Sequence, residues 1–242
     1  MLIYPPVVRT LREVRRERTE FIPRFFERSP WFSPIVRAAS TFAEEADWPE
    51  VDSLGRAFAS EPPVRFVPAA PKRRGPRGRR AAPRPKAELY DAWITRRREV
   101  PTRPRSWHDY LNALVWATFP RAKLALHERQ HRAVEAWVPD GAERLPNART
   151  RELDALALID EGGVVRLESP GESATLVFGH ALYEGLVLEN RSMIARAVVL
   201  DVDAVPEGVM AQADVVDLAL AAALTDPMRL RVPEELPRAR LT

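Results

Sequence analysis

Residues 106–137 read SWHDYLNALVWATFPRAKLALHERQHRAVEAW, and this stretch decides the fold class. Ser106 stands three positions before Asp109, a spacing typical of a helix start, where a side-chain oxygen caps a free backbone N–H. Apolar residues follow at helical intervals as far as Phe119, and Pro120 is suited to begin a second helix. Two helices joined this tightly predict a helical hairpin.

Extended segments are predicted further along the chain. Two short apolar runs on either side of Glu161-Gly162-Gly163 predict a β-hairpin over about residues 156–168. β-Branched side chains favour another strand over about residues 195–203. We therefore expect an α+β fold: a predominantly helical single domain over residues 1–242, with a small antiparallel or mixed sheet.

Composition excludes several classes of protein. Hydrophobic residues make up 45% of the chain, enough for a sizeable core, and the absence of cysteine excludes disulfides, thiolate nucleophiles and Cys-ligated zinc. No run approaches the roughly 20 apolar residues that cross a bilayer, and the first residues do not resemble a signal peptide. We expect a cytoplasmic protein without a membrane partner.

The segment 68–86, PAAPKRRGPRGRRAAPRPK, carries eight positive charges and no negative one. It is expected to be a mobile insertion, because it lacks side chains for a packed face. Only three of the 37 basic residues are lysines, which a GC-rich genome explains; affinity for nucleic acid or an acidic partner through residues 72–84 is the alternative. The side chains expected to make that contact are Arg73, Arg74, Arg77, Arg79 and Arg80.

The run over residues 106–123 resembles the signature of a bacterial family, domain of unknown function 3025 (DUF3025). RELDALALIDEGG (residues 151–163) and FGHALYE (residues 178–184) resemble two further family segments, so the likeness covers roughly residues 25–235. It implies a shared fold and no established catalytic residues. The matching positions in the first run are Trp107, His108, Asp109, Asn112, Trp116, Phe119, Pro120, Arg121 and Lys123.

Polar side chains recur at helical i, i+4 spacing, which places both members of a pair on one helix face. His108 with Asn112 and His180 with Glu184 are two such pairs, and such faces can hold a divalent ion such as zinc, manganese or iron. The metal ligands expected are His108, Asp109, His180 and Glu184, and the wider set of catalytic candidates is His108, Asp109, Asn112, Lys123, Asp160, Glu161, His180 and Glu184.

These candidates suit a metal-dependent hydrolase. Asp109 or Glu184 would act as the general base, and Lys123 would stabilise developing negative charge. No phosphate-binding loop, dinucleotide fingerprint, nucleophile elbow or H-E-x-x-H motif occurs, which disfavours the corresponding enzyme classes.

Each candidate also has a purely structural interpretation. Asp109 would simply cap its helix, His180 and Glu184 would form an ion pair, and Asp160 would belong to a turn. A further i, i+4 pair lies in the polar run HERQHR (residues 127–132), where we expect its histidines to be solvated. Three hypotheses stay open: a metal-dependent hydrolase, a non-enzymatic binding module using residues 72–84, and a structural protein without a site.

Overall fold

The computed structural model describes residues 20–70, 89–139, 149–188 and 193–241. Helices dominate these residues, and two sheets accompany them, which confirms the α+β class. The insertion predicted over 68–86 falls mostly on residues 71–88, outside the described residues. The α-helices are α2 (Val36–Ser40), α3 (Tyr90–Arg97), α4 (Trp107–Thr118), α5 (Pro120–Trp137), α6 (Arg151–Gly162), α7 (His180–Val187) and α8 (Val209–Thr225), and short 3-10 helices cover Phe25–Arg28, Pro30–Ile35, Val51–Ala57 and Pro233–Glu235.

The larger sheet is mixed and has the strand order β4-β3-β5-β6. β3 pairs in parallel with β5 and antiparallel with β4, and β5 pairs antiparallel with β6. A separate pair, β1 and β2, runs parallel just before α4. The strands are β1 (Arg65–Pro68), β2 (Glu99–Thr102), β3 (Gly163–Ser169), β4 (Glu172–Val177), β5 (Met193–Asp201) and β6 (Arg238–Leu241).

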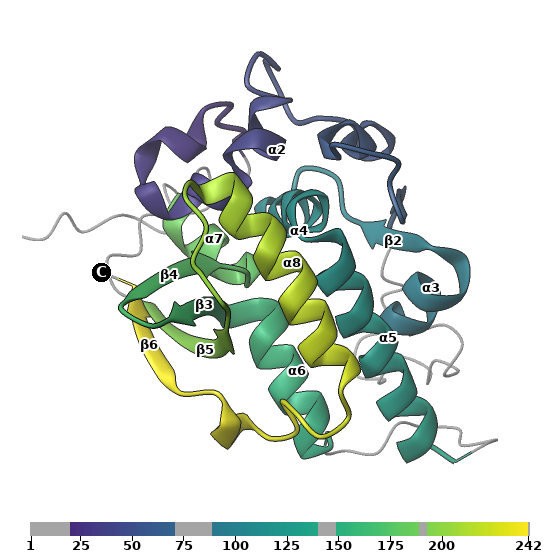
Figure 1. Cartoon of the computed structure of the whole chain (residues 1–242). Coiled ribbons are helices and arrows are strands. Elements are labelled where there is room, and N and C mark those ends of the chain that lie inside the picture. The colour runs from purple at the N-terminus through teal and green to yellow at the C-terminus, as the bar shows by residue number, and fades with distance from the viewer. Residues whose placement is uncertain (1–19, 71–88, 140–148, 189–192, 242) are drawn as a thin grey trace, which may run out of the picture.

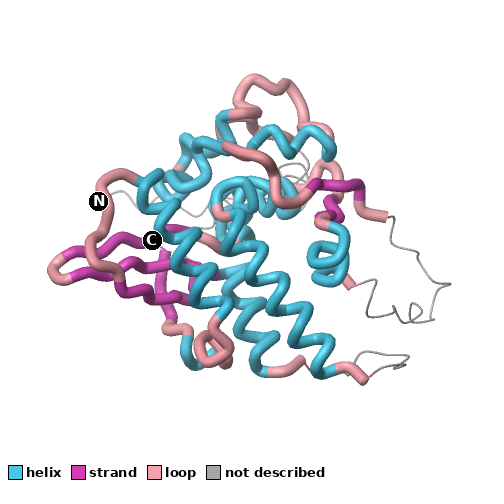
Figure 2. Tube along the Cα trace, turned by 45° about the vertical axis from the view of Figure 1, so that its right-hand side comes forward, coloured by secondary structure: helices cyan, strands magenta, loops and turns pink. Residues whose placement is uncertain are grey.

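The helical hairpin predicted from residues 106–137 is confirmed as α4 and α5. Ser106 caps α4 by accepting a hydrogen bond from the backbone N–H of Asp109 at 3.4 Å. Trp107, Leu111 and Leu114 are buried, as their spacing predicted. α5 packs against α3, α6 and α8, so it runs through the middle of the helical layer beside the larger sheet (Figures 1 and 2).

The first half of the predicted β-hairpin is wrong. Residues 156–160 belong to α6, which begins where Thr150 accepts a hydrogen bond from the backbone N–H of Leu153. Leu153, Leu156 and Ile159 recur at intervals of three residues and are all buried, which is a helical period. The hairpin lies further on, between β3 and β4, and turns at Gly171 with φ +84°. Asp160 therefore lies in the last turn of a helix and not in a hairpin turn.

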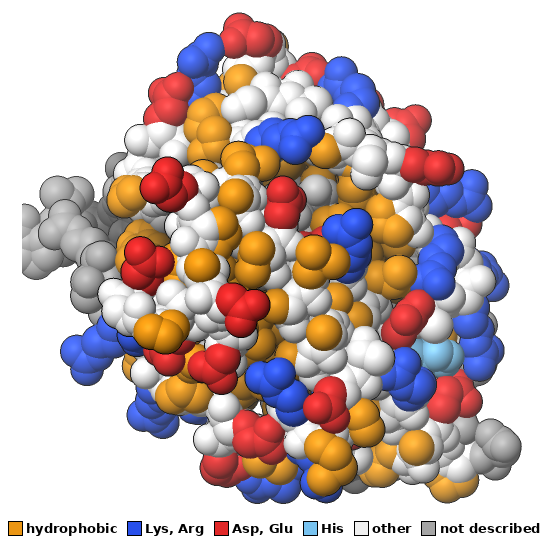
Figure 3. Space-filling model, viewed as in Figure 1, with side chains coloured by type: hydrophobic (Ala, Val, Ile, Leu, Met, Phe, Trp, Pro, Cys, Tyr) orange, Lys and Arg blue, Asp and Glu red, His pale blue; other side chains and the backbone are white. Residues whose placement is uncertain are grey.

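The surface in Figure 3, which views the molecule from the side of α8, mixes acidic, basic and apolar side chains. Leu218 on α8 is 55% exposed, but charged side chains surround the apolar ones on this face. No helix among the described residues is long and apolar enough to cross a membrane.

Candidate metal centre

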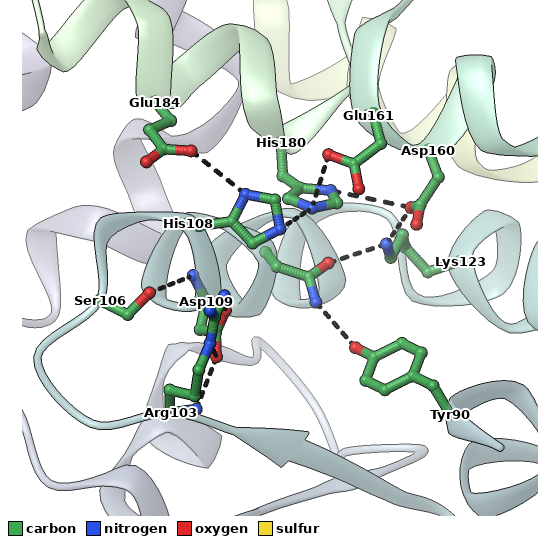
Figure 4. Close-up of polar contacts among 11 residues, drawn as sticks. Tyr90, Arg103, Ser106, His108, Asp109, Lys123, Asp160, Glu161, His180 and Glu184 are labelled. Atoms are coloured by element: carbon green, nitrogen blue, oxygen red, sulfur yellow. Dashed lines mark hydrogen bonds and ion pairs between the residues drawn. The ribbon is translucent and has the colours of Figure 1, made fainter. Parts of the chain in front are cut away.

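Three elements that are far apart in sequence meet at one point. His108 lies in the first turn of α4, Glu161 in the last turn of α6 and His180 at the start of α7 (Figure 4). α7 contacts both α4 and α6, so the three side chains share one region of the molecule. Two of the residues that the sequence analysis proposed as ligands, His108 and His180, are thus brought together.

Gly179 explains how His180 reaches the end of α6. Its backbone N–H donates to the carbonyl of Gly163 at 2.8 Å, just beyond Glu161. A Cβ at position 179 would lie 2.5 Å from the carbonyl oxygen of Glu161 and 2.5 Å from the amide nitrogen of Gly163. Side-chain atoms do not approach backbone so closely, so only glycine permits this contact. The backbone therefore fixes His180 beside Glu161.

The three side chains present one donor atom each to a common point. The Nε2 atoms of His108 and His180 lie 3.0 Å apart, and His180 Nε2 lies 3.5 Å from Glu161 Oε2. All three donor atoms fall within 4.8 Å of one another. Two donors at roughly 2.0–2.1 Å from one ion lie about 2.9 Å apart at a right angle and about 3.4 Å apart at the tetrahedral angle. The spacing therefore suits a single ion.

Burial differs among the three donors. The His180 side chain is 4% exposed, whereas His108 is 31% and Glu161 51% exposed. Solvent therefore contacts the side chains of His108 and Glu161, whereas the side chain of His180 is enclosed.

Each imidazole has a carboxylate behind it. The Nδ1 atom of His108 lies 3.2 Å from Glu184 Oε2, and Nδ1 of His180 lies 3.8 Å from Asp160 Oδ1. The hydrogen bond to Glu184 raises the pKa of His108, although burial opposes it. Burial lowers the pKa of His180 to about 3, so this imidazole is neutral at physiological pH. Burial and the nearby charge of Asp160 raise the pKa of Glu161.

A buried lysine completes the surroundings. The Lys123 side chain has no exposed surface, and its Nζ atom donates to Asp160 Oδ1 at 2.5 Å and to Asn112 Oδ1 at 2.8 Å. Asn112 in turn donates to the hydroxyl of Tyr90 at 3.1 Å. Burial alone would raise the pKa of Asp160, but the charge and hydrogen bond of Lys123 together with the nearby imidazoles of His180 and His127 outweigh burial and lower the pKa. Asp160 is therefore a carboxylate.

Asp109 lies apart from this cluster. Its carboxylate accepts hydrogen bonds from the backbone N–H of Arg103 at 2.6 Å and from the Arg103 guanidinium at 2.6 and 2.9 Å (Figure 4). The carboxylate that joins the two histidines is that of Glu161, which the sequence analysis included among the catalytic candidates but not among the ligands.

The histidines of the run HERQHR are buried, so the expectation that they are solvated is wrong. His127 is 1% exposed and His131 9%. Nδ1 of His127 lies 2.9 Å from Asp91 Oδ1, and its ring stacks on Trp116 with the centroids 5.4 Å apart. Because α5 packs against α3, α4, α6 and α8, these polar side chains are covered.

Sequence reasoning missed Gly179. Its signal was a glycine placed directly before a histidine, between a strand and a helix. The arginines at positions 73, 74, 77, 79 and 80, proposed as contacts for a partner, lie outside the described residues.

Comparison with known proteins supports the family resemblance. Residues 79–174 match the sequence model of the family described as "Protein of unknown function (DUF3025)", which supports the expected resemblance. The match includes α4, α5 and α6. It therefore covers two of the three donor residues, His108 and Glu161, and the buried Lys123 beside them. No curated protein and no solved structure matches the chain.

Proposed function

We propose that this protein is a metal-dependent hydrolase that holds one divalent ion through His108, His180 and Glu161. The convergence of two imidazole Nε2 atoms and a carboxylate within the reach of one ion carries the proposal. Asp109, one of the expected ligands, is left out because Arg103 engages its carboxylate.

The donor set defines the class of ion. Two imidazoles and one carboxylate suit zinc, iron(II) or manganese, whereas calcium and magnesium favour all-oxygen sites. The opposite ring nitrogen of His108 has a carboxylate partner, Glu184, at 3.2 Å, as metal-binding histidines do, and the Asp160 carboxylate lies 3.8 Å from the opposite ring nitrogen of His180.

Three protein ligands leave coordination positions for water and a substrate. An ion in such a site polarises bound water and a substrate oxygen, which is the chemistry of hydrolysis. The exposed side at Glu161 and Glu184 gives water and substrate access to the centre. Lys123 is fully buried, so its ammonium does not reach a substrate, and Glu184 is engaged with His108.

Activity after metal exchange tests the proposal. Protein stripped with a chelator and reloaded with zinc, manganese or iron(II) is assayed on chromogenic phosphate and carboxylate esters. We expect activity to return with one of these ions and to be lost in His180→Ala. The matched control is His131→Ala, a buried histidine of α5 that does not belong to the centre. Equal activity in both variants, or none with any ion, would contradict the proposal.

The alternative, a module that binds nucleic acid or an acidic partner, rests on the charge of residues 72–84 alone. Bacterial origin and cytoplasmic residence also remain proposals, supported by the family resemblance and by the absence of cysteine.

A further inference from the structure

We infer that Lys123 and Asp160 are positioning residues that hold His180 in the tautomer with hydrogen on Nδ1, so that its Nε2 lone pair is presented to the ion. The metal-binding part of this inference rests on the proposed function, but the tautomer is a property of the metal-free protein. Lys123 and Asp160 do not contact the ion themselves, and orienting His180 gives this buried charge pair a role.

Burying this charge pair costs free energy, so its position next to His180 indicates a role there. Lys123 has no exposed surface and Asp160 is 13% exposed, and removing two charges from water costs several kcal/mol per ion before their attraction is counted. The Lys123 ammonium makes two hydrogen bonds, one to Asp160 and one to Asn112, and lies 5.6 Å from the centre of the Trp116 ring. These contacts fix the Asp160 carboxylate on the side of His180 away from His108.

The negative charge of the Asp160 carboxylate acts on the His180 ring at short range. Oδ1 of Asp160 lies 3.8 Å from Nδ1 of His180, too far for a hydrogen bond but close for an electrostatic effect in a buried site. Nδ1 has no hydrogen-bond partner among the described residues. A lone pair on Nδ1 would face the negative charge, whereas an N–H there is attracted by it. The arrangement therefore favours hydrogen on Nδ1 and a free lone pair on Nε2.

The contact between the two histidines agrees with this assignment. Two Nε2 atoms 3.0 Å apart need one hydrogen between them. With the lone pair on His180, that hydrogen belongs to His108 Nε2. Because Nδ1 of His108 faces the Glu184 carboxylate and holds a hydrogen as well, the metal-free His108 ring carries hydrogen on both nitrogens. An ion that bound here would displace this hydrogen as a proton into solution and would then meet a lone pair on each ring. Glu184 thus faces Nδ1 of His108 in the same way as the Lys123–Asp160 pair faces Nδ1 of His180, and each favours a hydrogen on the nitrogen that it faces.

Nitrogen NMR of the metal-free protein tests the tautomer directly. His180 ring signals, assigned by their loss in His180→Gln, are compared between the unmodified chain and the double variant Lys123→Met/Asp160→Leu. The double variant replaces both charges with apolar side chains of similar size, a change that buried ion pairs often tolerate, whereas either single change strands a charge. We expect hydrogen on Nδ1 in the unmodified protein and a shift toward Nε2 in the variant.

Zinc titration of the same proteins supplies the second readout. The double variant should remain folded yet bind zinc about 10–100-fold more weakly, the usual effect of losing a partner behind a metal ligand. Asp217→Asn, a change at another buried carboxylate, should leave zinc affinity unchanged. Hydrogen on Nε2 in the unmodified protein, or unchanged zinc affinity in the double variant, would overturn the inference. If the unmodified chain failed to bind zinc but showed the expected tautomer and shift, the proposed function would fail and the tautomer assignment would stand.

Discussion

Gly179→Ala is the most informative single substitution for the geometry of the centre. The added methyl would lie 2.5 Å from the carbonyl oxygen of Glu161 and from the amide nitrogen of Gly163, and 2.6 Å from the carbonyl carbon of Glu161. All three are backbone atoms, so no flexible side chain can move aside. The start of α7 must therefore withdraw from the end of α6 by at least about half an ångström to reach ordinary contact distances.

The cost follows from this displacement. Overpacking of this kind destabilises by about 1–3 kcal/mol, and the 2.8 Å hydrogen bond from Gly179 to Gly163 is strained as well. The same movement carries His180 away from Glu161, and a centre loosened by this much should lose metal affinity on the order of tenfold. Stability and zinc binding should therefore fall together.

Gly162→Ala, one residue before β3, is the matched control. Position 162 has nothing within 4 Å of an added Cβ and no positive φ, so alanine there should stabilise by about 0.4–1 kcal/mol by restricting the unfolded chain. Urea denaturation and zinc titration of both variants measure the two effects. If Gly179→Ala proved as stable as Gly162→Ala and bound zinc like the unmodified protein, the close contact of α6 and α7 would not hold His180 in place.

Three further predictions concern other parts of the chain. Asp217 on α8 accepts a hydrogen bond at 2.8 Å from the backbone N–H of Ala122 in the first turn of α5. Asp217→Ala should therefore lower the free energy of unfolding, measured by urea denaturation, by about 1–3 kcal/mol, and Asp217→Asn should lower it less. Equal losses in the two variants would contradict this prediction. Burial and the charge of Arg96 lower the pKa of His131, so folding favours its neutral form and the free energy of unfolding should fall as the pH drops below about 6.5. His131→Gln should make this fall smaller. An unchanged pH profile of stability in His131→Gln would refute the prediction. If residues 72–84 bind nucleic acid, deleting them should reduce the salt dependence of DNA binding measured by fluorescence anisotropy, and identical slopes would exclude that role.

The sequence predicted the helical part of the fold well because its signals are local. Ser106 caps α4, Pro120 begins α5, and the apolar residues between them have a helical period. The failure over residues 156–160 has a physical cause: a short apolar run fits a strand or a buried helix equally well. The helix begins at Thr150, and its buried residues repeat at intervals of three.

The candidate site was predictable in its residue types but not in its partnerships. His108 and His180 stood out as histidines on short motifs, yet the choice between Asp109 and Glu161 as third ligand depends on tertiary contacts. Arg103, six residues before Asp109, donates hydrogen bonds to the Asp109 carboxylate and so holds it away from the histidines. Gly179 brings Glu161 to His180 through a backbone approach that periodicity does not reveal.

The direct test of the centre is the metal content of the purified chain after equilibration with zinc and removal of loosely bound ions. We predict one zinc ion per chain, with none retained by His108→Ala/His180→Ala and one retained by His127→Ala, whose imidazole pairs with Asp91 outside the cluster. Equal zinc content in the two variants, or none in the unmodified protein, would show that His108, His180 and Glu161 do not form a metal centre.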